Sequence, residues 1–160
     1  DPAHAPLARR QHHAEGHRGV RQALRMSRER AMAFERAWVR TLGVLLFAYA
    51  TASLVHHVHN AAYLADYPNM PPWITRSTVY AAWLAETLLG GAGYLLLRRG
   101  HPTFGLGVIA VYAALGFDAF GHYALAPAAA HTIAMNATIW LEAAAAALVF
   151  VAIAALVRRP

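Results

Sequence analysis

Residues 131–157 read HTIAMNATIWLEAAAAALVFVAIAALV. This stretch decides the fold, because it is apolar for longer than the roughly 20 residues that a helix needs to cross a bilayer. Three further stretches are comparably long and apolar: residues 41–63, 73–97 and 103–125. Only 14% of the 160 residues are charged, whereas a soluble domain carries about 25%. The sequence therefore predicts an all-α integral membrane protein whose residues 41–160 form a four-transmembrane-helix bundle.

The chain ahead of the first apolar stretch has a different character. Residues 1–18 are rich in His, Ala, Pro and Arg without any period, which predicts a flexible, basic, His-rich arm. Residues 19–40 place apolar side chains at helical spacing among Arg and Glu. That pattern predicts an amphipathic cytoplasmic helix suited to the membrane surface. No short apolar stretch with a cleavage site is visible, so no signal peptide is expected.

The arginines predict the orientation of the bundle. Nine of the 14 lie in residues 1–40, and four more form the pairs Arg98-Arg99 and Arg158-Arg159. The two remaining loops hold only Arg76. The positive-inside rule therefore places both termini in the cytoplasm. The same distribution does not suit a nucleic-acid-binding face, so the expected partners are the lipid bilayer and other membrane subunits or further copies of the chain.

Ionisable side chains from all four apolar stretches are predicted to lie at a common height. Counted from the nearest cytoplasmic anchor at about 1.5 Å of rise per residue, they fall about 18–28 Å up. A charged group at membrane depth costs several kcal/mol and normally faces the bundle interior or marks a functional site. We therefore expect a cluster in the extracytoplasmic half of the bundle, with His57 pointing away from it. Its members are His56, His59, Glu86, Asp118, His122 and Glu142.

Imidazoles and carboxylates that meet in a bundle core are ligands for copper, iron or zinc. The absence of Cys excludes a thiolate site and cysteine catalysis. The expected first ligands are His56, His59, Asp118 and His122, with Glu142 and Glu86 as further ligands or proton relays. The side chains expected to line the pocket are Tyr63, Trp83 and Trp140. Haem b, held by a first-span His and His122, is the alternative cofactor.

Two metal-free alternatives stay open. In the first, the buried polar groups only hold the helices together, in an accessory or assembly subunit. In the second, the protein is a lipid- or sterol-handling enzyme that uses buried carboxyl groups for proton transfer. Glu86 and Glu142 are then the candidate catalytic residues, with Asp118 beside them.

One helix resembles a known family. Residues 85–97, AETLLGGAGYLLL, are similar to the second helix of the DoxX-like membrane proteins, in which an intramembrane Glu precedes a Gly-rich apolar run that ends at a short cytoplasmic turn. Arg40 and Gly43 at the start of the first span, and His122 near the end of the third, extend the resemblance over roughly residues 38–157. It implies a small subunit of the bacterial cytoplasmic membrane with a role in quinone-linked redox complexes. The His56–Asn60 segment and Asp118 depart from the family pattern.

A second similarity is local. Asp118 and His122, followed by His131, resemble the Asp/His/His copper site in the C subunit of particulate methane and ammonia monooxygenases. The spacing to the last His differs, so this similarity only keeps copper among the expected ions. From the sequence we expect a small redox-associated membrane protein that binds a metal ion or haem, as a subunit of a larger complex.

Overall fold

The computed structural model describes residues 5–158, with side chains described for residues 21–158 except 23 and 31. Every regular element in this part of the chain is helical, which confirms the all-α prediction. The chain falls into two compact units, Asp1–Val39 and Arg40–Pro160.

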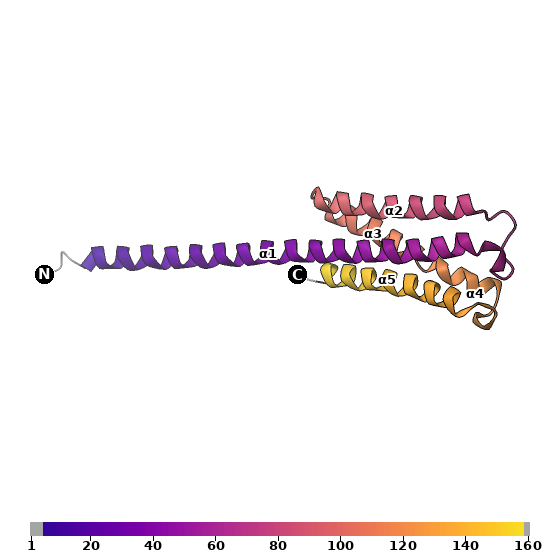
Figure 1. Ribbon diagram of the computed structural model, residues 1–160. Coiled ribbons are helices and arrows are strands. Elements are labelled where there is room, and N and C mark those ends of the chain that lie inside the picture. The colour runs from indigo at the N-terminus through magenta and orange to yellow at the C-terminus, as the bar shows by residue number, and fades with distance from the viewer. Residues whose placement is uncertain (1–4, 159–160) are drawn as a thin grey trace. The chain divides into compact units, whose positions relative to one another are not determined.

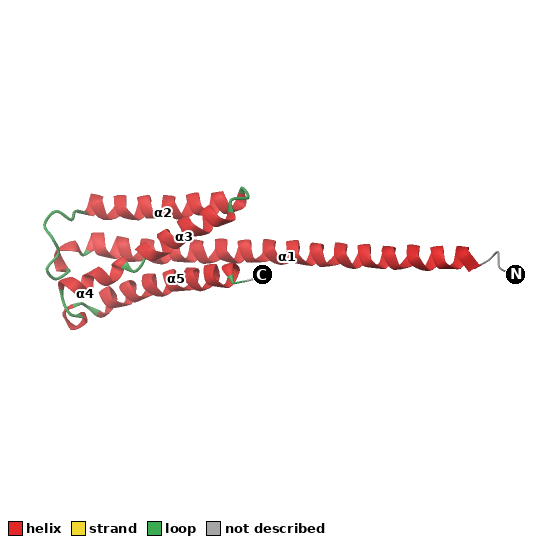
Figure 2. Cartoon of the chain, turned by 180° about the vertical axis from the view of Figure 1, so that it is seen from behind, coloured by secondary structure: helices red, strands yellow, loops and turns green. Residues whose placement is uncertain are grey.

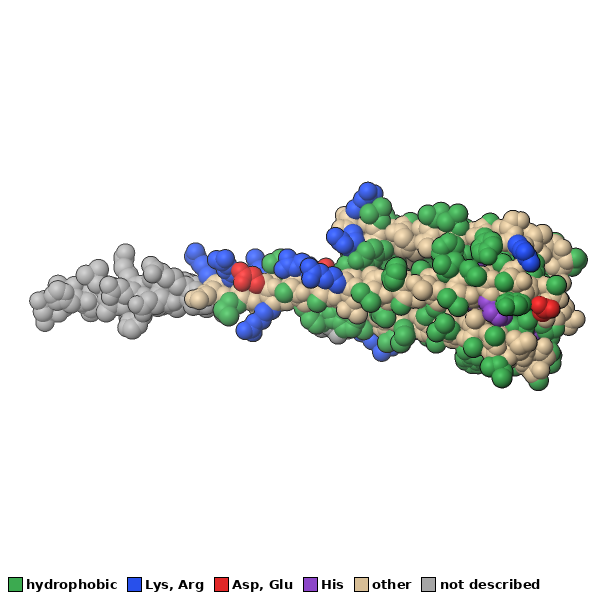
Figure 3. Space-filling view, viewed as in Figure 1, with side chains coloured by type: hydrophobic (Ala, Val, Ile, Leu, Met, Phe, Trp, Pro, Cys, Tyr) green, Lys and Arg blue, Asp and Glu red, His purple; other side chains and the backbone are tan. Residues whose placement is uncertain are grey.

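The first unit is built by the N-terminal part of helix α1 (Ala5–Ala62). No helix boundary occurs at residue 18, where the sequence predicted the end of a flexible arm, and residues 1–4 of that arm lie outside the described residues. Ala, Arg, Gln and Glu, frequent in this stretch, all favour helix. The described side chains of this unit are nearly all exposed, and Figure 3 shows Arg gathered along it. Arg25 pairs with Glu29 one turn later at 2.9 Å.

The second unit is a helical bundle. It contains α1 from Arg40 onward, α2 (Arg76–Arg98), α3 (Pro102–Leu115), the short α4 (Gly121–Leu125) and α5 (Ile133–Val157). Figures 1 and 2 show that this part of α1 lies between α2 and α5. Hydrophobic side chains cover much of the visible face of the unit in Figure 3, as expected of a surface that meets lipid.

Three helical segments in the described part of the chain are long and apolar enough to cross a membrane. They are Leu24–Ala62, Pro102–Leu125 and Ile133–Val157. Helix α2 has 23 residues but is not among them. It opens on Arg-Ser-Thr and carries Glu86 and three glycines, which lower its mean hydropathy. The predicted span over residues 73–97 therefore stays a prediction.

The third predicted span is not one continuous helix. After α3 ends at Leu115, a 3-10 turn (Asp118–Phe120) precedes α4. At Gly116 an added Cβ would lie 2.4 Å from the Tyr49 hydroxyl and 2.7 Å from the Ala146 Cβ, so the backbone here passes very close to α1 and α5. The break places Asp118 in a turn instead of one helical turn before His122 on a shared face.

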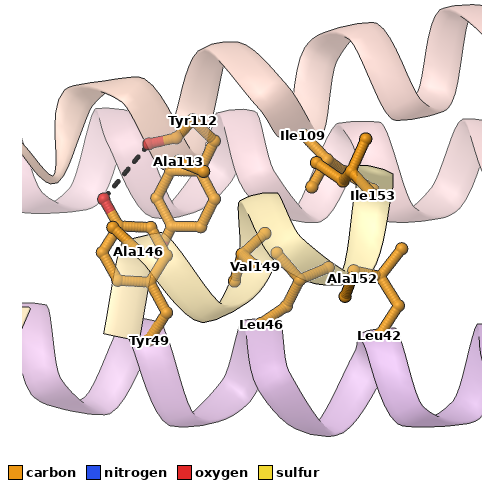
Figure 4. Close-up of a cluster of buried hydrophobic side chains, with 10 residues drawn as sticks. All are labelled: Leu42, Leu46, Tyr49, Ile109, Tyr112, Ala113, Ala146, Val149, Ala152 and Ile153. Atoms are coloured by element: carbon orange, nitrogen blue, oxygen red, sulfur yellow. Dashed lines mark hydrogen bonds between the residues drawn. The ribbon is translucent and has the colours of Figure 1, made fainter. Parts of the chain in front are cut away.

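A hydrophobic core fills the half of the bundle that lies towards Arg98, and Figure 4 shows it. At its centre the rings of Tyr49 and Tyr112 lie 4.5 Å apart, and the Tyr49 hydroxyl donates to the Tyr112 carbonyl at 3.1 Å. Side chains from α1, α3 and α5 surround this pair: Leu42, Leu46, Ile109, Ala113, Ala146, Val149, Ala152 and Ile153. Polar groups are absent from this cluster apart from the two tyrosine hydroxyls, so the ionisable residues gather elsewhere.

Glycines bring α2 and α3 into close contact. A Cβ added at Gly105 would lie 2.6 Å from the backbone nitrogen of Leu97 and 2.8 Å from the carbonyl oxygen of Gly93. No side chain larger than hydrogen fits such an approach, which small residues commonly allow between membrane helices. This contact holds the Arg98 ends of the two helices together.

Candidate functional site

Two adjoining cavities lie towards the opposite end of the bundle, which carries loops 63–75 and 126–132 and is called the loop end here. The inner cavity, of about 120 Å³, is lined by His56, His57, Asn60, Glu86, Leu115, Asp118, Ala119, His122 and Glu142. The outer cavity, of about 210 Å³, is lined by His57, Asn60, Trp73, Ile74, Thr78, Val79 and Ala82. Both share His57 and Asn60, so the two cavities adjoin at these side chains.

His56 of α1 faces Glu142 of α5 across the inner cavity. Both side chains are buried, and His56 Nε2 lies 3.9 Å from Glu142 Oε2. This distance is too long for a direct hydrogen bond. Glu142 Oε2 has no hydrogen-bond partner among the described residues. A buried carboxylate oxygen without a partner is costly, so the site favours any group that can fill the gap.

Thr138 fixes the tautomer of neutral His56. The Thr138 hydroxyl donates to the Met135 carbonyl at 3.0 Å, so its oxygen accepts from His56 Nδ1 at 3.2 Å. Neutral His56 therefore carries its proton on Nδ1, and its Nε2 presents a lone pair towards Glu142. Histidines that bind metals are held in this way, by a hydrogen bond from the nitrogen that does not touch the ion.

His122 of α4 closes another side of the inner cavity. Its ring centre lies 5.3 Å from that of His56, and only 9% of the residue is exposed. The side-chain nitrogen of Asn60 lies 3.3 Å from His122 Nε2, while Asn60 Oδ1 is buried without a partner. The ring of Tyr67, from the first loop, lies over His122 at 4.6 Å. His56, His122 and Glu142 thus form a buried polar cluster.

The remaining predicted ligands stand farther from this cluster. Glu86 is half-buried and Asp118 is exposed, although both line the inner cavity. Asp118 was expected among the first ligands, but the helix break after Leu115 turns it to the rim. His59 lines neither cavity. Its Nδ1 instead lies 3.0 Å from the Tyr67 hydroxyl.

The three aromatic side chains predicted to line the pocket lie outside both cavities. Tyr63 and Trp140 are 51% and 59% exposed, and Trp140 packs against Phe120 with ring centres 5.0 Å apart. Trp83 is half-buried and donates from its indole nitrogen to the Ala50 carbonyl at 3.3 Å. Trp83 thus bonds to the backbone of α1, whereas Tyr63 and Trp140 lie on the outer surface of the bundle.

The structure adds residues that the sequence did not single out. His57, expected to point away, lines both cavities because its Nδ1 bonds back to the Ser53 carbonyl at 2.9 Å and draws the ring sideways. Thr138 and Tyr67 had no signal of their own, since a lone Thr in a span or a Tyr in a loop is common. Asn60 shares a helix face with His56, and that spacing was the one available signal.

The chain matches no family model, no curated protein and no solved structure. Its function must therefore be argued from the site itself. Across the described residues, no group of three or more His, Asp or Glu side chains is assembled closely enough to hold a metal ion as it stands. The site offers one imidazole lone pair, one unpartnered carboxylate oxygen and a second imidazole within a small polar cavity.

Proposed function

We propose that this chain is a four-span membrane protein that binds a transition-metal ion in its inner cavity, in the extracytoplasmic half of the bundle. The observation that carries the proposal is the pair His56 Nε2 and Glu142 Oε2, which face each other at 3.9 Å with no other partner for the carboxylate oxygen. Metal–ligand bonds of about 2.1 Å each can join two atoms at this separation. A cation there would satisfy both groups.

His122 is the third ligand in this proposal. It reaches the ion by giving up its contact with Asn60, whose buried Oδ1 has no partner in the present arrangement. Two imidazoles and a carboxylate suit zinc, copper or iron. Glu86 and Asp118 at the rim supply negative charge to balance the cation. The cavity of about 120 Å³ favours an ion over haem b, because pockets for small molecules begin at about 300 Å³.

The redox role and the partner subunits rest on the resemblance of residues 85–97 to the DoxX-like helix. Within that proposal, the half-buried Glu86 lies at the cavity rim and relays protons to or from the bound ion. The metal site itself does not depend on the resemblance, since its residues depart from the family pattern.

The test is metal analysis of the protein purified in lipid nanodiscs, with titration of copper, zinc and iron. We expect about one ion per chain in the wild type. Loss of a residue that only hydrogen-bonds to a metal ligand lowers metal affinity by about 10–100-fold. Glu142→Gln and His56→Ala change the ligands themselves, so they should weaken binding by about 100-fold or more. Exposed His101 gives the matched control His101→Ala, which should bind as the wild type does. Equal metal content in all four proteins rejects the site.

A metal-free accessory subunit is the second candidate, and one observation favours it. His56 and His122 already have hydrogen-bonding neighbours in Thr138 and Asn60, as purely structural residues would. Chelation separates the two candidates. Removal of a bound ion lowers thermal stability by mass action and mimics the loss of Glu142, whereas a structural network does not respond to a chelator.

A further inference from the structure

At the loop end, Tyr67 covers the His122 side of the inner cavity, while the exposed lining residue Asp118 stands at the cavity rim. Tyr67 is 3% exposed and its ring lies over His122 at 4.6 Å, tilted by 35°. The Tyr67 hydroxyl lies 3.0 Å from His59 Nδ1, and His131 packs against its edge with ring centres 6.3 Å apart.

The outer cavity offers a lateral way in. It lies between the last turns of α1 and the first turns of α2, where Thr78 and Ala82 are exposed and Trp73 is 73% exposed. Trp73 of the outer cavity lies in the loop before α2 and Thr78 lies in the first turn of α2, whereas Glu142 of the inner cavity lies about 14 Å from the start of α5. The outer cavity is therefore the shallower of the two, and it adjoins the inner cavity at His57 and Asn60.

His57 has the chemistry to receive a cation on this route. Its Nδ1 donates to the Ser53 carbonyl at 2.9 Å, which leaves the lone pair on Nε2. The ring stands edge-on to that of His56, with centres 5.7 Å apart. A cation held briefly by His57 thus lies next to His56, the first of the proposed permanent ligands.

We infer that cations reach the inner cavity sideways, through the outer cavity, and that His57 is a transit ligand between solvent and His56. The cation class rests on the proposed function, but the route does not. Transit through His57 implies that its loss changes the rates of uptake and release together and leaves the equilibrium affinity unchanged.

The route is tested without metal. The chain has no Cys, so Ala119→Cys places one thiol on the wall of the inner cavity, where the residue is 6% exposed. Methanethiosulfonate ethylammonium, a small cation, should label it in nanodiscs. Adding Ala82→Trp in the outer cavity should slow labelling by about tenfold or more, since a modest added barrier has that effect. The matched control Ala81→Trp, exposed on the same turn and outside both cavities, should not.

Two further arms keep the result decisive. A bulky thiol reagent attached to Ala82→Cys by a disulfide before labelling should block access, and its reduction before labelling should restore access, which tests the route without the Trp substitution. Stopped-flow binding of the metal should be slower in His57→Phe with an unchanged dissociation constant. Equal labelling in the Ala82→Trp and Ala81→Trp proteins overturns the route, and a changed dissociation constant overturns the transit role. If the wild type binds no metal while labelling still depends on Ala82, the route stands and the proposed metal function fails.

Discussion

The hydroxyl of Tyr49 donates to the carbonyl of Tyr112 at 3.1 Å, across the interface between α1 and α3. Tyr112 belongs to the last turn of α3, where carbonyls have no partner within the helix. This bond therefore stabilises the helix end that precedes the turn at Asp118. The apolar core and the polar cavity are joined at this point, because the same break that ends α3 brings α4 and His122 to the inner cavity.

Tyr49→Phe should lower the free energy of unfolding by about 1 kcal/mol, the usual net contribution of one buried hydrogen bond. The ring and its packing against Tyr112 are retained, so the loss reports the hydroxyl alone. Denaturant unfolding in nanodiscs measures it. Tyr80→Phe, at a position 44% exposed, is the control and should change stability by far less. An equal effect at both positions would show that the bond does not hold the helix end.

Gly105→Ala should destabilise the contact between α2 and α3. The new Cβ would lie 2.6 Å from the Leu97 nitrogen, and backbone cannot move aside as a side chain can. Overpacking of this kind costs about 1–3 kcal/mol. Gly107→Ala is the matched control on the same helix, because a Cβ there meets nothing within 4 Å. It should be neutral or stabilising by up to about 1 kcal/mol, since alanine is the better helix former. Thermal unfolding of both variants checks the prediction.

The all-α fold and the cluster of His56, His122 and Glu142 could be predicted because they follow from periodicity. Long apolar runs and helical rise fix which residues reach one height. The positions of Asp118 and Tyr67 could not be predicted in the same way. The break after Leu115 depends on how closely Gly116 approaches Tyr49 and Ala146, which is a tertiary contact. Tyr67 lies in a loop, where no period indicates which way a side chain turns.

The same limit applies to the aromatic residues. Tyr63, Trp83 and Trp140 lie at heights suited to the site. Height along a helix does not determine whether a side chain points into the bundle or outward. Trp140 is nearly two helical turns from Ile133 and points outward, whereas Glu142, two residues later, points inward. Hydropathy also does not decide whether α2 crosses the membrane. Its glycines allow close packing against α3, and they also lower the mean hydropathy by which a span is recognised.

Tyr67 should make the stability of the protein sensitive to alkali. Burial raises its pKa from 10.0 to about 12, so between these values the unfolded chain loses the phenol proton while the folded chain keeps it. The unfolded state then binds fewer protons, and the free energy of unfolding falls as the pH rises from 10 towards 12. Tyr67→Phe should flatten this slope in denaturant unfolding at pH 8, 10 and 11. Tyr63→Phe, at the 51% exposed neighbour in the same loop, is the control. A slope unchanged in Tyr67→Phe would contradict the buried cover.

Glu142→Leu separates a binding site from structural glue. Glu142 is 2% exposed with one oxygen unpartnered, so the metal-free protein bears the cost of burying it. Replacing an unsatisfied buried polar group by an apolar one of similar size removes about 1–3 kcal/mol of that cost. Metal-free Glu142→Leu should therefore be as stable as the metal-free wild type or more so. Of these two proteins, the wild type alone should gain stability from added metal, by about 2.7 kcal/mol at a hundredfold excess over its dissociation constant.

The control for Glu142→Leu is the same substitution at a less buried carboxylate. Glu86→Leu, at the half-buried rim of the same cavity, should change metal-free stability less and keep part of the response to metal. Calorimetric unfolding of the three proteins, each with and without the metal, gives both quantities at once. A metal-free Glu142→Leu protein that is clearly less stable than the metal-free wild type would mean that this carboxylate holds the helices together, and that Glu142 is a structural partner of His56 instead of a metal ligand.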